Sequence, residues 1–198
     1  MSDNFKEKAK EWDNKSIRVQ NAHTIAKCIK GKINLTKDMH IMDFGVGTGL
    51  LGFEILEDVK SMDGIDTSEG MLEKLEEKNT TEKRIKPICQ DIIKTPISTK
   101  YDGVISSMTL HHVENLDSFF KIIRKSLNED GFIAIADLMD EDGTFHSDNT
   151  GVFHFGFSED KLKEIVKSCG FKDVEFEHIY TINKPHRDFD IFLLTAKV

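Results

Sequence analysis

Apolar segments of strand length alternate with segments of helical periodicity between His40 and Leu138, and this alternation constrains the fold more than any other feature. The predicted strands are residues 40–44, 61–65, 85–90, 101–107 and 131–138. The last of these is expected to be apolar along its whole length. Helical patterns lie at 50–59, around 71–75 and at 116–127. A β-α-β-α order predicts an α/β fold with a parallel sheet and helices on both faces.

The two ends of the chain depart from this alternation. Two helices are predicted before the first strand, over residues 4–14 and 16–30, with Gly31 as the stop. Residues 162–169 form a further helix that Gly170 closes. Strands are predicted at 172–180 and 189–198, and the connection between them is too short for a parallel crossover. The last two strands are therefore expected to form an antiparallel hairpin.

Composition narrows the class of protein. The chain has 198 residues, which fits one domain. Its formal net charge is -8, and it lacks the basic stripe that a nucleic-acid-binding protein normally shows, so DNA or RNA is disfavoured as a substrate. Its longest apolar runs are strand-sized, and residues 1–10 carry no apolar stretch, so neither a membrane span nor a secretory signal is expected. The three cysteines are far apart, which favours reduced thiols and a cytoplasmic location.

The strongest local motif is Asp43-Phe44-Gly45-Val46-Gly47-Thr48-Gly49, between the first predicted strand and the following helix. Alternating glycines let the backbone turn tightly and approach a ligand, and free N–H groups at a helix start can hold an anion. The motif therefore predicts a ligand-binding loop, with a plain strand-to-helix turn as the alternative.

A dinucleotide site is the main competing interpretation of this loop. Residues 47–52 also satisfy G-x-G-x-x-G, and Asp66 lies close to the distance expected for a ribose-binding acid. Asp43 argues against a dinucleotide, because a carboxylate beside the loop would repel a pyrophosphate. It suits a ligand with a cationic ammonium or sulfonium group and no phosphate, as in S-adenosylmethionine (SAM).

The ordered motifs resemble those of class I SAM-dependent methyltransferases, in the small-molecule, ubiquinone-biosynthesis-like branch. The glycine motif resembles the family's first motif, Gly64-Ile65-Asp66-Thr67-Ser68 its second-strand end, and Cys89-Gln90-Asp91-Ile92 its third-strand end. Residues 101–112 are similar to the family's fourth strand and following loop, and residues 127–131 to the turn before strand five. The resemblance extends from about Trp12 onward. It implies one domain, 1–198, with a Rossmann-like, seven-stranded, mostly parallel sheet of order 3-2-1-4-5-7-6 and an antiparallel last strand.

The resemblance also implies cofactor contacts. Asp66 would bind both ribose hydroxyls, Met71 would pack on adenine, and Asp91 would accept from the adenine amino group. Trp12 would cover SAM as part of an N-terminal helical lid, residues 1–36. The implied cofactor-binding set is Trp12, Asp43, Gly45, Gly47, Thr48, Gly49, Asp66, Thr67, Met71, Asp91, Ile92 and Ser107. The alternatives are turn capping for the two strand-end acids and a hydrophobic anchor for Trp12.

Two histidines after the fourth predicted strand are the candidate catalytic residues. Methyl transfer depends mainly on positioning, and a general base helps only where the acceptor must lose a proton. His112 is the first choice for that base, whereas His111 is expected near the methionyl end of SAM. No metal is predicted, because His112, His146 and His154 lack the spacing of tight metal motifs.

Residues 140–157 form an insert, rich in Phe, Gly and His, that is expected to face the acceptor. Its phenylalanines either line an apolar pocket or pack in the core. The fourth strand is not followed by an Asn/Asp-Pro-Pro-Tyr/Phe loop, and the catalytic cysteine of cytosine-C5 enzymes is missing. Both absences favour a small-molecule acceptor.

The predicted function is methyl transfer from SAM to a small molecule, with S-adenosylhomocysteine (SAH) as product. An NAD(P)-dependent oxidoreductase is one alternative, although neither Tyr101 nor Tyr180 has a lysine four positions later. A non-catalytic SAM-binding protein is another, because a fold does not fix a function. The acceptor, its reacting atom, the use of a general base or a metal, and the oligomeric state stay open.

Overall fold

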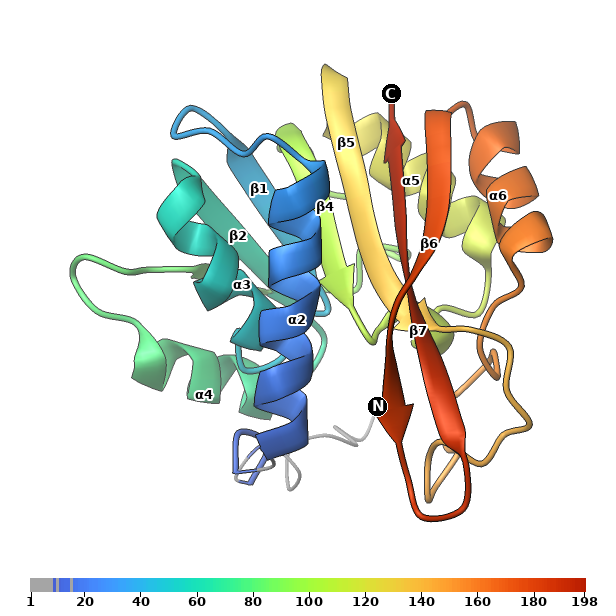
Figure 1. The fold of residues 1–198 in the computed structure, drawn as a ribbon. Coiled ribbons are helices and arrows are strands. Elements are labelled where there is room, and N and C mark those ends of the chain that lie inside the picture. Colours follow the sequence, from blue (N-terminus) through green and yellow to red (C-terminus); the bar gives the residue numbers. More distant parts are fainter. Residues whose placement is uncertain (1–8, 10, 15) are drawn as a thin grey trace.

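The computed structural model describes residues 9, 11–14 and 16–198, which fold around one seven-stranded sheet (Figure 1). The strand order is β3-β2-β1-β4-β5-β7-β6. The strands are β1 (His40–Phe44), β2 (Ser61–Asp66), β3 (Lys86–Cys89), β4 (Tyr101–Ser107), β5 (Leu127–Leu138), β6 (Lys172–Asn183) and β7 (Asp188–Lys197). Strands β1 to β5 pair in parallel, whereas β7 runs antiparallel to both of its neighbours. The predicted order and the reversed last strand are confirmed.

Helices cover both faces of the sheet. The helices are α2 (Ser16–Lys32), α3 (Leu50–Ile55), η1 (Leu56–Asp58), α4 (Glu69–Lys78), η2 (Leu110–His112), α5 (Leu116–Ser126) and α6 (Glu159–Ser168). One apolar core joins α2, α3 and α4 to the sheet, and the other joins α5 and α6 to the opposite face. Burial of both sheet faces explains why the central strands are so apolar. No helix in the described part of the chain is long and apolar enough to cross a membrane.

Several predicted boundaries are wrong. Gly31 lies inside α2, which continues to Lys32, and the predicted helix 50–59 is α3 followed by a short 3-10 turn. Strand β5 begins at Leu127, so residues 127–131 belong to a strand and not to a turn. Of the predicted helix 4–14, most lies outside the described residues, and residues 11–14 form turns.

Strand β5 is also not apolar throughout, because it contains Asp137. This acid is 0% exposed, on a strand whose other residues from 132 to 138 are buried and apolar. A buried carboxylate needs a partner. Its partner turns out to be a histidine that follows β4.

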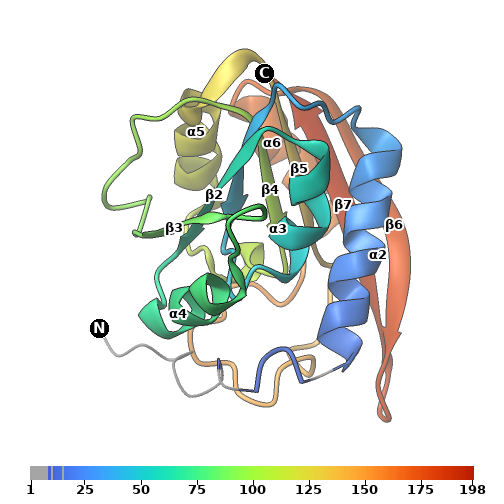
Figure 2. The same ribbon diagram turned by 90° about the vertical axis from the view of Figure 1, so that its left-hand side faces the viewer.

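The carboxyl ends of the parallel strands meet at one edge of the sheet, the lower edge in Figure 1. Residues 11–14, the start of α2 and residues 140–157 lie at this same edge in both views (Figures 1 and 2). Ligands of open α/β sheets bind at such an edge, close to the point where the strand order reverses. Strands β1 and β4 flank that point in this sheet.

Candidate functional site

The glycine loop, residues 45–49, connects β1 to α3 as predicted. The backbone N–H groups of Gly45 and Val46 both donate to the Ile65 carbonyl, at 2.8 and 3.0 Å, and so fix the loop to β2. Gly45 has φ +69°, and a Cβ placed on it would lie 2.2 Å from Thr109 Cγ2. A Cβ on Gly47 would meet nothing within 4 Å. The loop is therefore closed on its Thr109 side and open where a ligand can approach Gly47.

Asp66 lies at the end of β2 and contacts the glycine loop directly. Its Oδ2 accepts from the Gly47 N–H at 2.8 Å, and its Oδ1 accepts from the Ser68 N–H at 2.9 Å. The acid thus caps local backbone groups, which was the alternative to ribose binding. A carboxylate offers about four acceptor positions, so the geometry is compatible with both roles.

Asp43 is a buried acid beneath the same loop, 1% exposed. Its Oδ2 has no hydrogen-bond partner among the described residues. Burial raises the pKa of the Asp43 carboxyl well above its ordinary value, and the nearby charge of Asp66 raises it further. Two acids at the ends of β1 and β2 therefore repel each other, and a cationic group bound beside them would relieve that repulsion.

The remaining predicted contact residues lie at the end of β4 or in the segments that follow β2 and β3. Asp91 follows β3; its Oδ1 accepts from the Ile93 N–H at 3.1 Å, and its pairing with Lys94 lowers the pKa of its carboxyl. The structure therefore places Asp91 in a turn-capping position close to the end of β2, since Cys89 pairs with Asp66. Met71 and Ile92 are buried, Thr67 is exposed, and Ser107 ends β4 half-buried.

The segment containing Trp12 is fastened to the loop by its neighbour Asp13. The Thr48 hydroxyl donates to Asp13 Oδ1 at 2.6 Å, and Lys78 Nζ lies 2.7 Å from Asp13 Oδ2. The Arg18 guanidinium stacks 3.6 Å from the Trp12 ring centre. Residues 11–14 thus join the glycine loop to α4, as a cover for this edge would.

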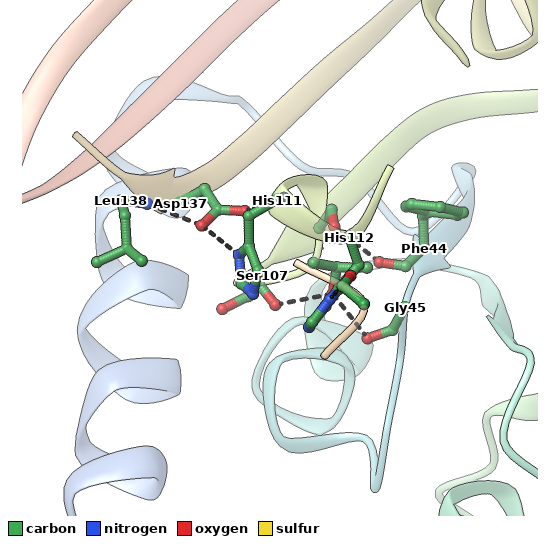
Figure 3. Close-up of polar contacts among 10 residues, drawn as sticks. Phe44, Gly45, Ser107, His111, His112, Asp137 and Leu138 are labelled. Carbon is green, nitrogen blue, oxygen red and sulfur yellow. Dashed lines mark hydrogen bonds and ion pairs between the residues drawn. The ribbon is translucent and has the colours of Figure 1, made fainter. Parts of the chain in front are cut away.

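His111 and His112 follow β4 and adopt different environments (Figure 3). His111 is 1% exposed, and its Nδ1 lies 2.8 Å from Asp137 Oδ1. Its Nε2 is buried and has no partner in the part of the chain that the structure describes. An unsatisfied buried polar atom is destabilising by about 1–3 kcal/mol. His112 is half-buried, with Nδ1 2.7 Å from the Gly151 carbonyl.

The 140–157 insert packs over these histidines. The backbone N–H groups of Phe153 and His154 both donate to the His111 carbonyl, at 3.0 and 3.3 Å. The His146 ring lies 4.8 Å from the His111 ring, and its Nε2 is also buried without a partner among the described residues. Burial lowers the pKa of His146 to about 4, with the charges of His111 and His112 adding to the effect.

Two of the four phenylalanines of the insert pack against the core, as one of the two predicted roles requires, and the other two are exposed. Phe157 is buried in the core beside α5 and α6, and Phe145 packs against Phe189 with ring centres 5.1 Å apart. Phe153 and Phe155 are 52% and 46% exposed. His154 Nε2 lies 2.9 Å from the Val113 carbonyl, and this contact holds the insert against the segment after β4. Within the described ranges, no three His, Cys, Asp or Glu residues are arranged to hold a metal ion.

Sequence reasoning missed Asp13 and Asp137. An acid within an otherwise apolar strand was the available signal for Asp137, because such a residue is seldom buried without a partner. Asp13 had no comparable signal, since acids are common in exposed turns.

Comparisons with known proteins support the methyltransferase expectation. Residues 41–131 match the family model described as a methyltransferase domain. An uncharacterized methyltransferase of Schizosaccharomyces pombe is 28% identical over 158 residues, covering 69% of this chain and 55% of that protein. The chain spans about half the length of the curated relatives it matches.

Solved structures share the fold. A Haloferax volcanii protein in complex with the Trm112 methyltransferase activator has a TM-score of 0.81 at 17% identity, over 100% of this chain and 98% of that one. Phosphoethanolamine N-methyltransferase 2 of Haemonchus contortus, solved with SAM, has a TM-score of 0.72 at 16% identity, over 87% of this chain and 51% of that one. Residues 41–131 therefore match a methyltransferase-domain model, and the chain shares the Rossmann-like fold of these solved structures.

Proposed function

We propose that this chain is a SAM-dependent methyltransferase that acts on a small-molecule acceptor. The observation that carries the proposal is the pair of acids around an open glycine loop. Asp43 is buried with an unpartnered oxygen, Asp66 lies beside Gly47, and no side chain blocks Gly47. This arrangement fits a cationic nucleoside ligand better than a pyrophosphate.

The residues at this edge divide the proposed work between them. Asp66 and Asp91 would bind the ribose and the adenine amino group, and Met71 and Ile92 would form the apolar floor. Asp43 would supply negative charge close to the ligand's cationic end. Bound SAM supplies an electrophilic methyl group on a sulfonium. The chain's own contribution is to orient donor and acceptor and to exclude water, which can lower a barrier by about 7–11 kcal/mol.

Two segments would complete the site. Residues 1–36 would act as a lid, through the Asp13 contacts with Thr48 and Lys78. Residues 140–157 would form the acceptor side, because they cover the histidines after β4. A single domain over 1–198 and a cytoplasmic location belong to the same proposal. The cytoplasmic location fits the three cysteines, Cys28, Cys89 and Cys169, because none of them forms a disulfide.

Asp66→Ala is expected to weaken SAM and SAH binding about 10- to 100-fold, because hydrogen bonds to charged groups contribute roughly 1.5–3 kcal/mol. Isothermal titration of the purified chain measures this loss. Asp130→Ala is the matched control, since Asp130 is an exposed acid at the opposite end of β5. If the wild-type chain binds neither ligand at millimolar concentration, the proposal is wrong. Saturable binding of NADH instead would favour an oxidoreductase.

Asp13→Ala is expected to release residues 11–14 and to weaken SAM binding by several-fold, since partly exposed ion pairs contribute about 1 kcal/mol or less. Stopped-flow measurement of SAM dissociation should show a faster off-rate with little change in the on-rate. Glu11→Ala, in the same turn and exposed, serves as control. Equal off-rates for Asp13→Ala and wild type would contradict the lid.

A further inference from the structure

A cleft of about 550 Å³ lies at the amino edge of the sheet, opposite to the edge that carries the glycine loop. It opens where β4, β5 and β6 begin and where β7 ends, close to the C-terminus labelled in Figure 1. Sites for small ligands have volumes of roughly 300–1,000 Å³. Leu127 and Val198 are the two apolar residues in the lining, so an apolar ligand would find little surface to contact. The cleft therefore fits a polar ligand.

The charge of the cleft is positive. Four cationic side chains line it: Lys100, Arg124, Lys125 and Lys172. Glu129 is the acidic side chain in the lining. In the described part of the chain, none of the four cations forms an ion pair with a carboxylate, that of Glu129 or of Val198 included. The cleft thus concentrates uncompensated positive charge in a chain whose net charge is -8.

Backbone carbonyls hold two of these cations in place. Lys100 Nζ donates to the Lys125 carbonyl at 2.6 Å and to the Leu127 carbonyl at 3.3 Å. Arg124 Nε donates to the Gly170 carbonyl at 3.0 Å. A glycine is required at position 170, because a Cβ there would lie 2.9 Å from Arg124 Nε. A neutral carbonyl orients a cation without cancelling its charge, so both groups are positioned and remain fully charged at the wall of the cleft.

The dipole of α5 accounts for only part of this charge. Arg124 and Lys125 lie in the last turn of α5, where cations stabilise a helix by interacting with its negative end. That end corresponds to about half an elementary charge. This is less than the charge of the four cations, and Lys172 lies on a different element, β6.

Lys172 adds a second observation, because it lies directly opposite Lys197 in the β6–β7 pair. The side chains of directly opposite residues share one face of a sheet, and like charges in such positions are destabilising. Both lysines are exposed, and among the described residues neither has a carboxylate as an ion-pair partner. A bound anion would offset this repulsion together with the repulsion inside the cleft.

We propose that this cleft binds a small molecule that carries two or more phosphate groups. The planar Arg124 guanidinium spends Nε on Gly170, and its two terminal nitrogens make no hydrogen bond within the described ranges. Such a pair of nitrogens can bind two oxygens of one phosphate, and the three lysines add point charges for the next phosphate. Because the cations gather in one cleft and form no stripe, a compact polyphosphate fits better than a nucleic acid. The proposal does not depend on methyl transfer.

Isothermal titration of the full chain with inorganic pyrophosphate, in buffer without divalent metal ions, tests the proposal. Wild type should bind one equivalent, about tenfold or more tightly than inorganic phosphate, because a second charged group adds further charge-assisted bonds. The affinity should fall as the ionic strength rises from about 0.01 to 0.15 M, since the screening length shortens from about 30 to 8 Å. It should stay the same when SAH is present, because the cleft and the glycine loop lie at opposite edges of the sheet.

Two variants and a matched control locate the site. Arg124→Gln should weaken pyrophosphate binding about 10- to 100-fold. Lys172→Gln should weaken it by several-fold and at the same time raise the thermal midpoint by up to about 4 °C, because the repulsion from Lys197 is removed. Lys121→Gln removes the same charge from α5, but Lys121 lies outside the cleft and pairs with Asp117. That substitution should leave pyrophosphate binding unchanged.

ADP, titrated with SAH present, distinguishes the two sources of a polyphosphate. Binding tighter than that of pyrophosphate identifies a nucleotide, and equal or weaker binding identifies a free polyphosphate. Either result supports the site, provided that Arg124→Gln weakens it.

Four results would overturn the inference. They are pyrophosphate binding no tighter than that of phosphate, equal losses in Lys121→Gln and Arg124→Gln, a lower thermal midpoint in Lys172→Gln, and competition between pyrophosphate and SAH, which would place the anion at the glycine loop. A short polyglutamate peptide that binds more tightly than pyrophosphate would also reject the phosphate assignment, in favour of an acidic peptide. Failure of the wild-type chain to bind SAM or SAH would overturn the proposed function and leave this inference standing.

Discussion

Gly45→Ala is expected to lower the free energy of unfolding by roughly 2–5 kcal/mol, the sum of left-handed backbone strain and overpacking. Gly45 has φ +69°, and a new Cβ would lie 2.2 Å from Thr109 Cγ2, 2.3 Å from its Oγ1 and 2.7 Å from its Cβ. Thr109 is β-branched and its hydroxyl donates to the Ser107 carbonyl, so it cannot turn away freely. In a thermal melt the midpoint should fall by about 5–15 °C, and SAM binding should be lost.

Two other glycines provide matched controls for Gly45→Ala. Gly47 has φ +54° but open space around it, so Gly47→Ala should destabilise by only about 1–2 kcal/mol while still weakening SAM binding. Gly31 lies inside α2 with nothing within 4 Å, so Gly31→Ala should stabilise by up to about 1 kcal/mol. If the melting midpoint of Gly45→Ala equals that of Gly47→Ala, the Thr109 side chain moves aside to make room for the new methyl group, and the packing argument is wrong.

The strand positions were predictable because they depend on patterns that lie within short segments, whereas the order of the strands was implied only by the resemblance to class I methyltransferases. Strand β4 is predicted at its observed bounds, since Tyr101–Ser107 is a buried central strand flanked by polar residues. The reversed β7 followed from a connection too short for a crossover. Boundaries that depend on tertiary contacts were missed: β5 starts early because Leu127 pairs with Tyr101 on the neighbouring strand.

The candidate site was predictable only where a motif occupies adjacent positions. The glycine loop and Asp66 are brought together as expected, with the Gly47 N–H on the Asp66 carboxylate. The pairing of His111 with Asp137 spans 26 positions and was not found, because nothing in a local pattern links an acid in β5 to a loop after β4. Asp13 and Thr48 are likewise 35 positions apart. Long-range partners of this kind follow from the sheet register, which only the structure supplies.

The buried His111–Asp137 pair is expected to make stability depend on pH in a way that an exposed pair does not. His111 has a raised pKa in the folded chain, so its contribution is complete below about pH 6.5 and is lost as pH rises through the folded value. Asp137 has a lowered pKa, because the His111 charge and hydrogen bonds outweigh burial. Its contribution is complete above about pH 3.9 and is lost as pH falls through the folded value. The pair should therefore stabilise most between about pH 4 and 6.5.

Urea unfolding across this range, on wild type and Asp137→Ala, measures the effect. Removing one partner of a buried ion pair typically destabilises by about 3–5 kcal/mol, so the loss in Asp137→Ala should be largest near pH 5–6 and smaller towards pH 9. Asp190→Ala is the matched control, because Asp190 pairs with His178 at 3.2 Å with both side chains about half exposed. That substitution should change stability by about 1 kcal/mol or less at any pH. A pH-independent loss in Asp137→Ala would mean that the acid supports the fold only through its bonds to the His111 and Leu138 backbone N–H groups, and that the imidazole is not charged in the folded chain.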